Sequence, residues 1–206
     1  MPLSDIDVCS QSLGLCRAAS IASFDEGTNE ADICTLYYST FVNDILTRYP
    51  WSFATKKRRL NQDATAPLGE YTYSHIVPAN VLRIWGLFPS DSVGAQPITD
   101  YDIQTVDGGR RIFSNHENLW LDHTFYHSEE FWPAYFVTFA VKAFAALIAK
   151  PVTDQDDLQA SLQQQAWGRS DENETGGAYA TATKIDAMQK PGETIQSSPL
   201  VDARFS

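Results

Sequence analysis

The chain has 206 residues and a formal net charge of −11, a length that suits one domain, or one domain carrying an insertion. Hydrophobic residues make up 43% of it, which excludes wholesale disorder, and three cysteines, an odd number, exclude a disulfide-rich scaffold. The acidic balance argues against a protein that binds nucleic acid over its whole surface. It does not exclude a protein that lets DNA pass without binding it.

The first fifty residues predict two helices. The first follows a Ser4 N-cap, and its two cysteines are predicted to be small buried apolar residues rather than metal ligands or a redox pair. The second is predicted from about Glu30 to Tyr49 and is ended by Pro50. The apolar stripe of the first helix is Ile6, Cys9, Leu13 and Cys16. The predicted inward positions of the second are Ile33, Tyr37, Phe41 and either Ile45 or Leu46.

The middle of the chain has the alternation that is typical of strands. Alternating segments cover residues 71–77, 81–87 and 119–125. Two further segments, 98–106 and 110–114, flank Asp107-Gly108-Gly109, which is a hairpin signal. Four to six strands are therefore predicted between two helical ends.

The last third of the chain predicts helices again. A long apolar segment begins near Pro133 and is ended by Lys150-Pro151; its single charge, Lys142, favours a helix buried in a soluble protein over a membrane span. Thr153 and Asp156 resemble a capping box for a helix starting at about Asp154. Gly176-Gly177 should break this helix, and helical spacing resumes over 178–188.

These elements predict an α+β fold with four segments. Residues 1–55 and 128–190 supply helices, residues 56–127 form a β-rich insertion, and residues 191–206 form an extended tail. The N-terminal segment has no basic region or long apolar run, so no signal peptide is expected.

Motifs for catalysis or metal binding are weak. Residues 171–182 resemble an EF-hand loop, but Ala182 occupies the position that needs a bidentate glutamate. A zinc site could be drawn from His116, His123 and His127. On a strand, however, the last two would lie about 13 Å apart. We therefore expect no metal, no cofactor and no enzymatic activity.

Two charged segments are more distinctive. A basic cluster with interleaved aromatic residues could contact phosphates, or it could pair with acids of a neighbouring subunit or form the solvent face of an edge strand. Its candidate residues are Arg48, Trp51, Lys56, Lys57, Arg58 and Arg59. The second segment, residues 154–186, holds seven acids against Arg169 and Lys184 and is typical of a solvated helix face.

The sequence around the basic cluster resembles a known family. The strings RYPWSFATKKRRL and PLGEYTYSHIVPANVLRIWGLF are similar to the tail tubular protein A family of head-to-tail adaptors in tailed bacteriophages. That family has a Trp-x-Phe-Ala segment with basic residues, then a Leu-Pro-x-Asp-x-Leu-Arg corner. Val77 in place of Leu and Asn80 in place of the acid depart from this pattern. The resemblance covers roughly residues 5–190.

The resemblance implies a non-enzymatic virion protein, made in the host cytoplasm and located at the head–tail junction. Such adaptors form dodecamers that join the portal to the tail nozzle or tube and continue the DNA channel. The implied fold is an antiparallel bundle of about four helices with an inserted β-rich domain. Genomic DNA would pass without sequence-specific binding, and no membrane is involved.

This picture assigns roles to two sets of residues. Acids that line the channel would repel DNA phosphates, so that the duplex slides; the candidates are Asp154, Asp156, Asp157, Asp171, Glu172 and Glu174. Apolar and cationic residues of the C-terminal tail would contact the portal, and an added strand is one form that this contact could take; the candidates are Leu200, Val201, Arg204 and Phe205. Another connector component, such as a stopper or gene-transfer-agent adaptor, and a small metal-dependent hydrolase remain the alternatives.

Overall fold

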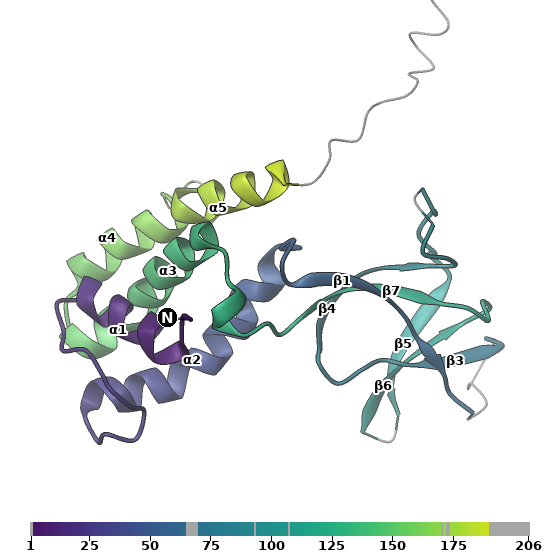
Figure 1. Cartoon of the computed structure of the whole chain (residues 1–206), viewed down its shortest axis with the longest axis horizontal. Helices are drawn as coiled ribbons and strands as arrows, with labels where there is room; N and C mark the ends of the chain where they lie inside the picture. Colours follow the sequence, from purple (N-terminus) through teal and green to yellow (C-terminus); the bar gives the residue numbers. More distant parts are fainter. Residues whose placement is uncertain are drawn as a thin grey trace, which may run out of the picture.

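Helices from both ends of the chain come together on one side of the molecule, and the strands between them form a second part (Figure 1). A computed structural model describes residues 2–64, 70–92, 94–106, 108–169, 171 and 174–189. The helices are α1 (Asp5–Leu15), α2 (Asn29–Arg48), α3 (Ala134–Thr153), α4 (Asp156–Trp167) and α5 (Gly177–Met188), with a short 3-10 helix at Glu129–Phe131. The predicted mixed α+β class is confirmed.

Helix α3 forms the centre of the helical part, where it contacts α1, α2, α4 and α5. It is long and apolar enough to cross a membrane by length and composition alone. In this fold most of its large side chains are buried in the core of the helical part, which accounts for its apolar sequence. The fully buried ones include Phe136, Phe139, Phe144 and Ile148.

The ends of the helices follow from local chemistry, with two corrections: the predicted end of α3 at Lys150-Pro151 and the predicted capping box at Thr153. Ser4 forms a complete capping box with Asp7 at the start of α1, and Pro133 is the N-cap of α3, as predicted. Helix α3 continues through Pro151 to Thr153 and ends at Asp154, which has a positive φ. The predicted capping box at Thr153 is wrong, because its hydroxyl donates to the Ala149 carbonyl and α4 starts only at Asp156.

Two separate helices, α4 and α5, are present as predicted, but α4 already ends at Trp167 with Gly168 as its C-cap, before the two glycines, which mark the start of α5. Gly177 has φ +58°, and a Cβ there would lie 2.7 Å from the Gly168 nitrogen and 2.8 Å from the Gln165 carbonyl oxygen. This close approach of backbone to backbone requires glycine. It lets α5 start directly beside the end of α4, so the acidic segment forms two helices rather than one.

The inward face of α2 differs from the prediction by one position in its first half. Cys34 and Tyr38 are buried, whereas Ile33 and Tyr37 are only half-buried; Phe41, Ile45 and Leu46 are buried as expected. The predicted burial of Cys9 and Cys16 is also confirmed. Burial raises the pKa of Cys16 to about 11, so its thiol is neutral at physiological pH.

Seven strands form two antiparallel sheets in the part of the chain that the structure describes. This is more than the predicted four to six, because two strands that lack apolar alternation were not predicted: the basic run at 55–59, which pairs with β7, and the short strand at 61–62, which pairs with β3. One sheet has the order β1-β7-β4 and the other β2-β3-β6-β5. The strands are β1 (Thr55–Arg59), β2 (Asn61–Gln62), β3 (Tyr73–Ile76), β4 (Val81–Phe88), β5 (Tyr101–Val106), β6 (Gly109–Ser114) and β7 (Trp120–Phe125).

The strand part has its own small hydrophobic core, separate from that of the helices. Its fully buried members include Leu87, Ile112 and Leu121. Leu60 also belongs to this core and lies between β1 and β2, so the chain passes there from one sheet to the other. The β5–β6 hairpin closes with Val106 opposite Gly109, as the glycine signal predicts.

Candidate interface surfaces

Strand β1 carries four residues of the basic cluster, Lys56 to Arg59, along an edge of its sheet. The Phe125 amide donates to the Ala54 carbonyl and the Leu60 amide donates to the Leu119 carbonyl, which fixes the alternation of hydrogen bonds between β1 and β7. Lys56 and Arg58 therefore direct their backbone groups toward β7. The backbone groups of Thr55, Lys57 and Arg59 are directed outward, where no further strand is found among the described residues.

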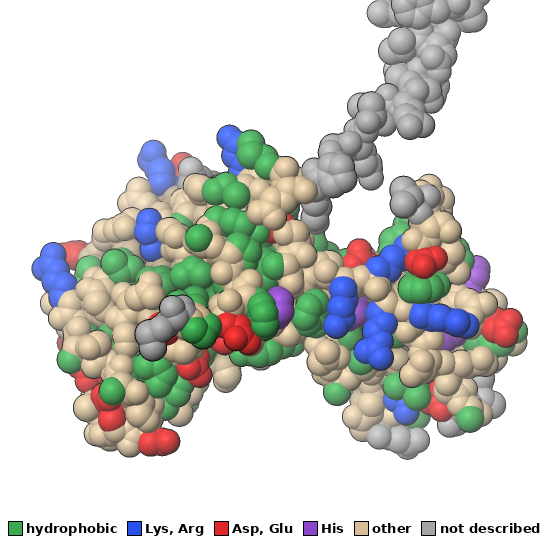
Figure 2. All heavy atoms as spheres, in the orientation of Figure 1, with side chains coloured by type: hydrophobic (Ala, Val, Ile, Leu, Met, Phe, Trp, Pro, Cys, Tyr) green, Lys and Arg blue, Asp and Glu red, His purple; other side chains and the backbone are tan. Residues whose placement is uncertain are grey.

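The side chains of this edge are held by aromatic and polar neighbours. Lys56 Nζ lies 4.0 Å from the centre of the Phe125 ring, and Lys57 Nζ lies 4.1 Å from that of Phe88. Arg59 donates to the Asn118 side chain. Lys56, Arg58 and Arg59 are exposed, and Figure 2 shows Lys and Arg side chains grouped on the strand part near the helices. The structure thus agrees with the edge-strand interpretation of the basic cluster.

Strand β5 is a second open edge, with the opposite charge. It is the last strand of its sheet, and its residues 102–105 are all exposed. Asp102 Oδ1 accepts a hydrogen bond of 2.8 Å from the Ile103 amide, so this amide is directed away from β6. Asp100, just before the strand, is also exposed. Ile103 is opposite the buried Ile112, yet it is itself 40% exposed, which leaves apolar surface at the edge.

The two members of the basic cluster outside β1 have other roles. Trp51 is fully buried, its indole N–H donates to the Ile45 carbonyl, and its ring packs 4.8 Å from that of Phe136. It cannot contact a phosphate or another subunit, which corrects the prediction. From the sequence alone, an aromatic residue next to cations cannot be assigned to a core or to an interface.

Arg48 forms ion pairs within its own chain. Its guanidinium lies 2.7 Å from the Glu174 carboxylate and 2.9 Å from that of Asp44, and it stacks 4.4 Å from the centre of the Trp167 ring. This arrangement joins α2 to the loop before α5. Arg48, a predicted subunit contact, and Glu174, a predicted channel residue, are therefore partners of each other in this fold.

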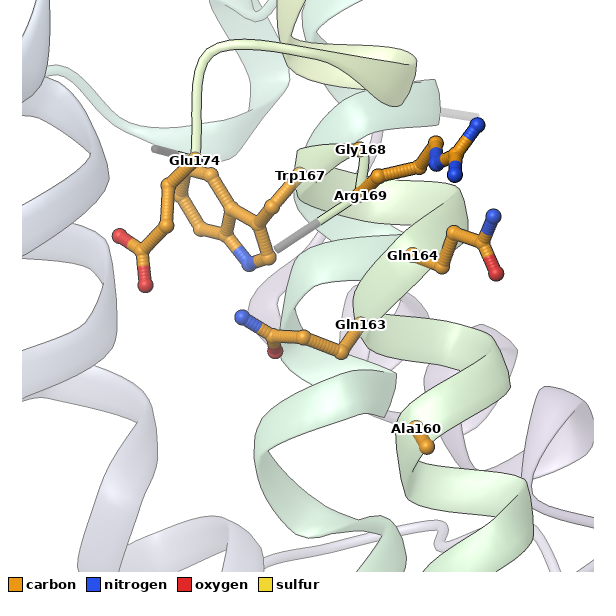
Figure 3. Close-up of a pocket in the computed structure, with 7 residues that line it drawn as sticks. All are labelled: Ala160, Gln163, Gln164, Trp167, Gly168, Arg169 and Glu174. Carbon is orange, nitrogen blue, oxygen red and sulfur yellow. The ribbon is translucent and has the colours of Figure 1, made fainter. Parts of the chain in front are cut away.

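Two adjoining hollows lie beside Trp167. The larger, of about 790 Å³, is lined by α4 and the loop after it, and Figure 3 shows Gln163 on the same side of α4 as the Glu174 carboxylate while Gln164 extends the other way. The smaller, of about 380 Å³, lies between α2, α3 and α4 and includes Leu147, which is 40% exposed. Their lining combines three glutamines with charged side chains: Gln159, Gln163, Gln164, Asp44, Arg48, Arg169 and Glu174.

The predicted channel residues are spread over the α3–α4 junction and the loop after α4. Lys150 Nζ lies 3.2 Å from the Asp154 carboxylate and 2.7 Å from that of Asp156. Asp157 is exposed on the first turn of α4. Asp171 lies near Arg169, at 3.6 Å between the charged groups. Glu172 lies outside the described residues, as do the four predicted portal contacts at 200–205.

Asp186 departs from the predicted solvated face, because it is fully buried. Both of its oxygens accept from the Ser52 amide at 3.1 Å, and Oδ1 also accepts from the Ser52 hydroxyl at 2.7 Å and the Tyr135 hydroxyl at 2.6 Å. Burial and the bond to Asp186 raise the pKa of Tyr135 to about 12, so the phenol keeps its proton. Asp186 thereby joins α5 to α3 and to the segment that leads into β1.

The histidines do not converge on a metal site. Among the residues that the structure describes, no group of three or more His, Cys, Asp or Glu could hold a metal ion. His123 lies on β7 opposite Lys56 and is buried, and burial lowers its pKa; its backbone hydrogen bond to Leu121 opposes this shift, and the charge of Lys56 adds to it. His127 is stacked 4.8 Å from the ring of Phe131.

No protein-family model matches the chain, and no curated protein matches it.

Proposed function

We propose that this protein is a head-to-tail adaptor of a tailed bacteriophage, a ring-forming virion protein that joins the portal to the tail nozzle or tube and continues the DNA channel. The observation that carries the proposal is the architecture: a strand part with its own core is inserted between helices from both chain ends. The family resemblance implies this order of helices, strands and helices along the chain. We propose that the helices form the antiparallel bundle of that family.

The charge distribution supports a role around passing DNA. The exposed carboxylates of Asp154, Asp156 and Asp157 cluster at the start of α4. In a ring, such acids facing the bore would repel phosphates over about 8–10 Å, the Debye length at physiological salt. The genome would then slide through without being retained. Cations that faced the bore would hold it instead.

The C-terminal residues 191–206 supply the proposed portal contact. Their sequence contains apolar and cationic anchors among polar residues, which suits recognition of a peptide segment by a partner protein. The anchors are Leu200, Val201, Arg204 and Phe205. We propose that they engage the portal above the ring.

The test is assembly with the portal of the same phage. We expect purified chain and portal oligomers to form a ring-on-ring particle in negative-stain microscopy, with a mass that corresponds to a closed ring of adaptor copies. A chain that stays monomeric beside the portal and turns over a small substrate would contradict the proposal.

The tail contact has its own matched variants. Replacing Leu200, Val201 and Phe205 together by serine should weaken portal binding at least tenfold, because the apolar anchors are lost. Replacing Gln196, Ser197 and Ser198 by alanine should leave binding within twofold. Equal binding by both variants would rule out the assigned anchors.

A further inference from the structure

We propose that copies of this protein join through strand addition, with the β5 edge of one copy pairing antiparallel to the β1 edge of the next. The inference rests on the proposed function, since a closed ring of identical subunits needs a head-to-tail contact between two different surfaces. It adds the contact itself: which two strands meet and in which register.

The two edges are placed for a head-to-tail contact. Strand β1 leads through Leu60 into β2, which is the first strand of the second sheet, whereas β5 is the last strand of that sheet, beyond β3 and β6. One copy can therefore offer β5 to one neighbour while its β1 accepts β5 of another. Contacts of this kind propagate instead of ending at a dimer.

Both edges present outward-directed backbone groups at matching intervals. On β1 the outward groups belong to Thr55, Lys57 and Arg59, as the bonds to β7 require. On β5 the Ile103 amide is directed away from β6, and by the same alternation Tyr101 and Thr105 share its direction. Asp102 satisfies the Ile103 amide only locally, through its own side chain, and a neighbouring strand can replace it.

One register pairs the charges as well. When Lys57 of one copy lies opposite Tyr101 of the next, Lys56 lies opposite Asp102 and Arg58 lies opposite Asp100. Residues directly opposite in an antiparallel pair lie on the same face, with side chains close enough to interact. Lys56 and Arg58, whose backbone groups are directed toward β7, thus each lie opposite a carboxylate of the next copy.

The cations on β1 also determine which strands it rejects. Lysines on an edge strand prevent indiscriminate pairing, and two β1 edges would repel each other because like charges would lie directly opposite. An acidic strand would be attracted to the cations of β1 instead of being repelled. Because β5 is acidic where β1 is basic, the chain carries both halves of the contact.

Cysteine cross-linking tests the register directly. Lys56 and Asp102 would occupy a non-hydrogen-bonded pair, where Cα atoms approach to about 4.5 Å, a distance that permits a disulfide. A chain with both Lys56→Cys and Asp102→Cys should form, on mild oxidation, a ladder of covalent dimers, trimers and larger species. The native cysteines are buried, so the wild-type chain provides the background.

The matched control moves one cysteine to an exposed position on α5. A chain with Lys184→Cys and Asp102→Cys has the same number of new thiols and should give no ladder above the level of the single variants. Equal ladders from both double variants, or none from the Lys56 pair, would overturn the inference.

Charge exchange tests the same contact without new covalent bonds. Lys56→Asp alone and Asp102→Lys alone should each weaken self-association at least tenfold, as measured by sedimentation equilibrium. The chain that carries both substitutions should recover most of this loss. Lys184→Glu, which changes net charge by the same amount as Lys56→Asp, should have little effect. If Lys56→Asp strengthens self-association instead, β1 is only a protective edge and the inference is wrong.

Cross-linking in the presence of the portal separates this inference from the proposed function. Rings on the portal with no ladder from the Lys56 pair would leave the adaptor function intact and refute strand addition. A ladder from a chain that does not bind the portal would support strand addition and refute the adaptor function.

Discussion

The helical part and the strand part of this protein satisfy their surfaces in different ways. The helical part surrounds one apolar helix with four others and closes a large aromatic core around Trp51. The strand part encloses a much smaller core and leaves two charged edges open. The contrast indicates that the helical part supplies most of the buried core, whereas the strand part exposes the two edges at which we propose self-association. Substitutions in each part can separate these two roles.

The largest effect is expected from Trp51→Ala. Removing a fully buried indole, together with its hydrogen bond to Ile45, should cost about 3–5 kcal/mol of stability. All three cysteines are buried in the helical part, so the rate of thiol labelling reports its opening. Trp85→Ala, a change to a half-buried indole of the strand part, should leave the labelling rate much closer to wild type.

Asp186→Ala should cost about 2–3 kcal/mol, because the Ser52 amide and the Tyr135 hydroxyl would lose their acceptor. Asp186→Asn keeps one acceptor oxygen and should cost less. The measurement is urea denaturation followed by circular dichroism, with Asp157→Ala as the exposed control. Equal midpoints for Asp186→Ala and Asp157→Ala would refute the role of this carboxylate.

His123 should make the strand part sensitive to acid. Burial holds the pKa of His123 below its ordinary value of about 6.5 in the fold, so the unfolded chain binds the proton more readily. This contribution to stability is complete above pH 6.5 and is lost as the pH falls toward the folded pKa. The protein can be labelled with 5-fluorotryptophan, and fluorine NMR can then follow the unfolding of Trp85 and Trp120 in urea. The urea concentration at their unfolding midpoint should be lower at pH 5 than at pH 7.

Two histidine variants assign this acid response. His123→Phe should reduce the dependence of the Trp85 and Trp120 midpoint on pH, whereas His116→Gln, at an exposed position, should leave it unchanged. A response that persists in His123→Phe would assign the sensitivity to other groups.

The smallest effect is expected at the ion pair between Arg48 and Glu174. Both side chains are partly exposed, and such pairs contribute about 0.5 kcal/mol. A double-mutant cycle with Arg48→Met and Glu174→Gln measures the coupling. A coupling several times larger would mean that this pair, rather than the core, determines how α2 and the loop before α5 are held together.

Sequence patterns predicted the elements that bury a continuous apolar face or carry a local signal. The Ser4 cap, the Pro133 start and the glycine hairpin are local, and they are all present. The patterns failed where tertiary contacts decide. Strand β1 forms because β7 pairs with it, and Trp51 is buried because helices surround it. Asp186 can be buried because Ser52 and Tyr135, which are distant in sequence, donate hydrogen bonds to its carboxylate. The type of a charged or aromatic residue does not by itself show which distant residues it contacts.

The Asp186 carboxylate also has a mechanical consequence. It lies on the final turns of α5, and its partner Ser52 lies three residues before β1. A pull on the C-terminal end of α5 would therefore reach the base of the strand part through a few short hydrogen bonds, without first passing along α4 and α3. Asp186, together with the contact between the Tyr179 and Trp51 rings, would thereby couple tension on α5 to the segment that leads into β1.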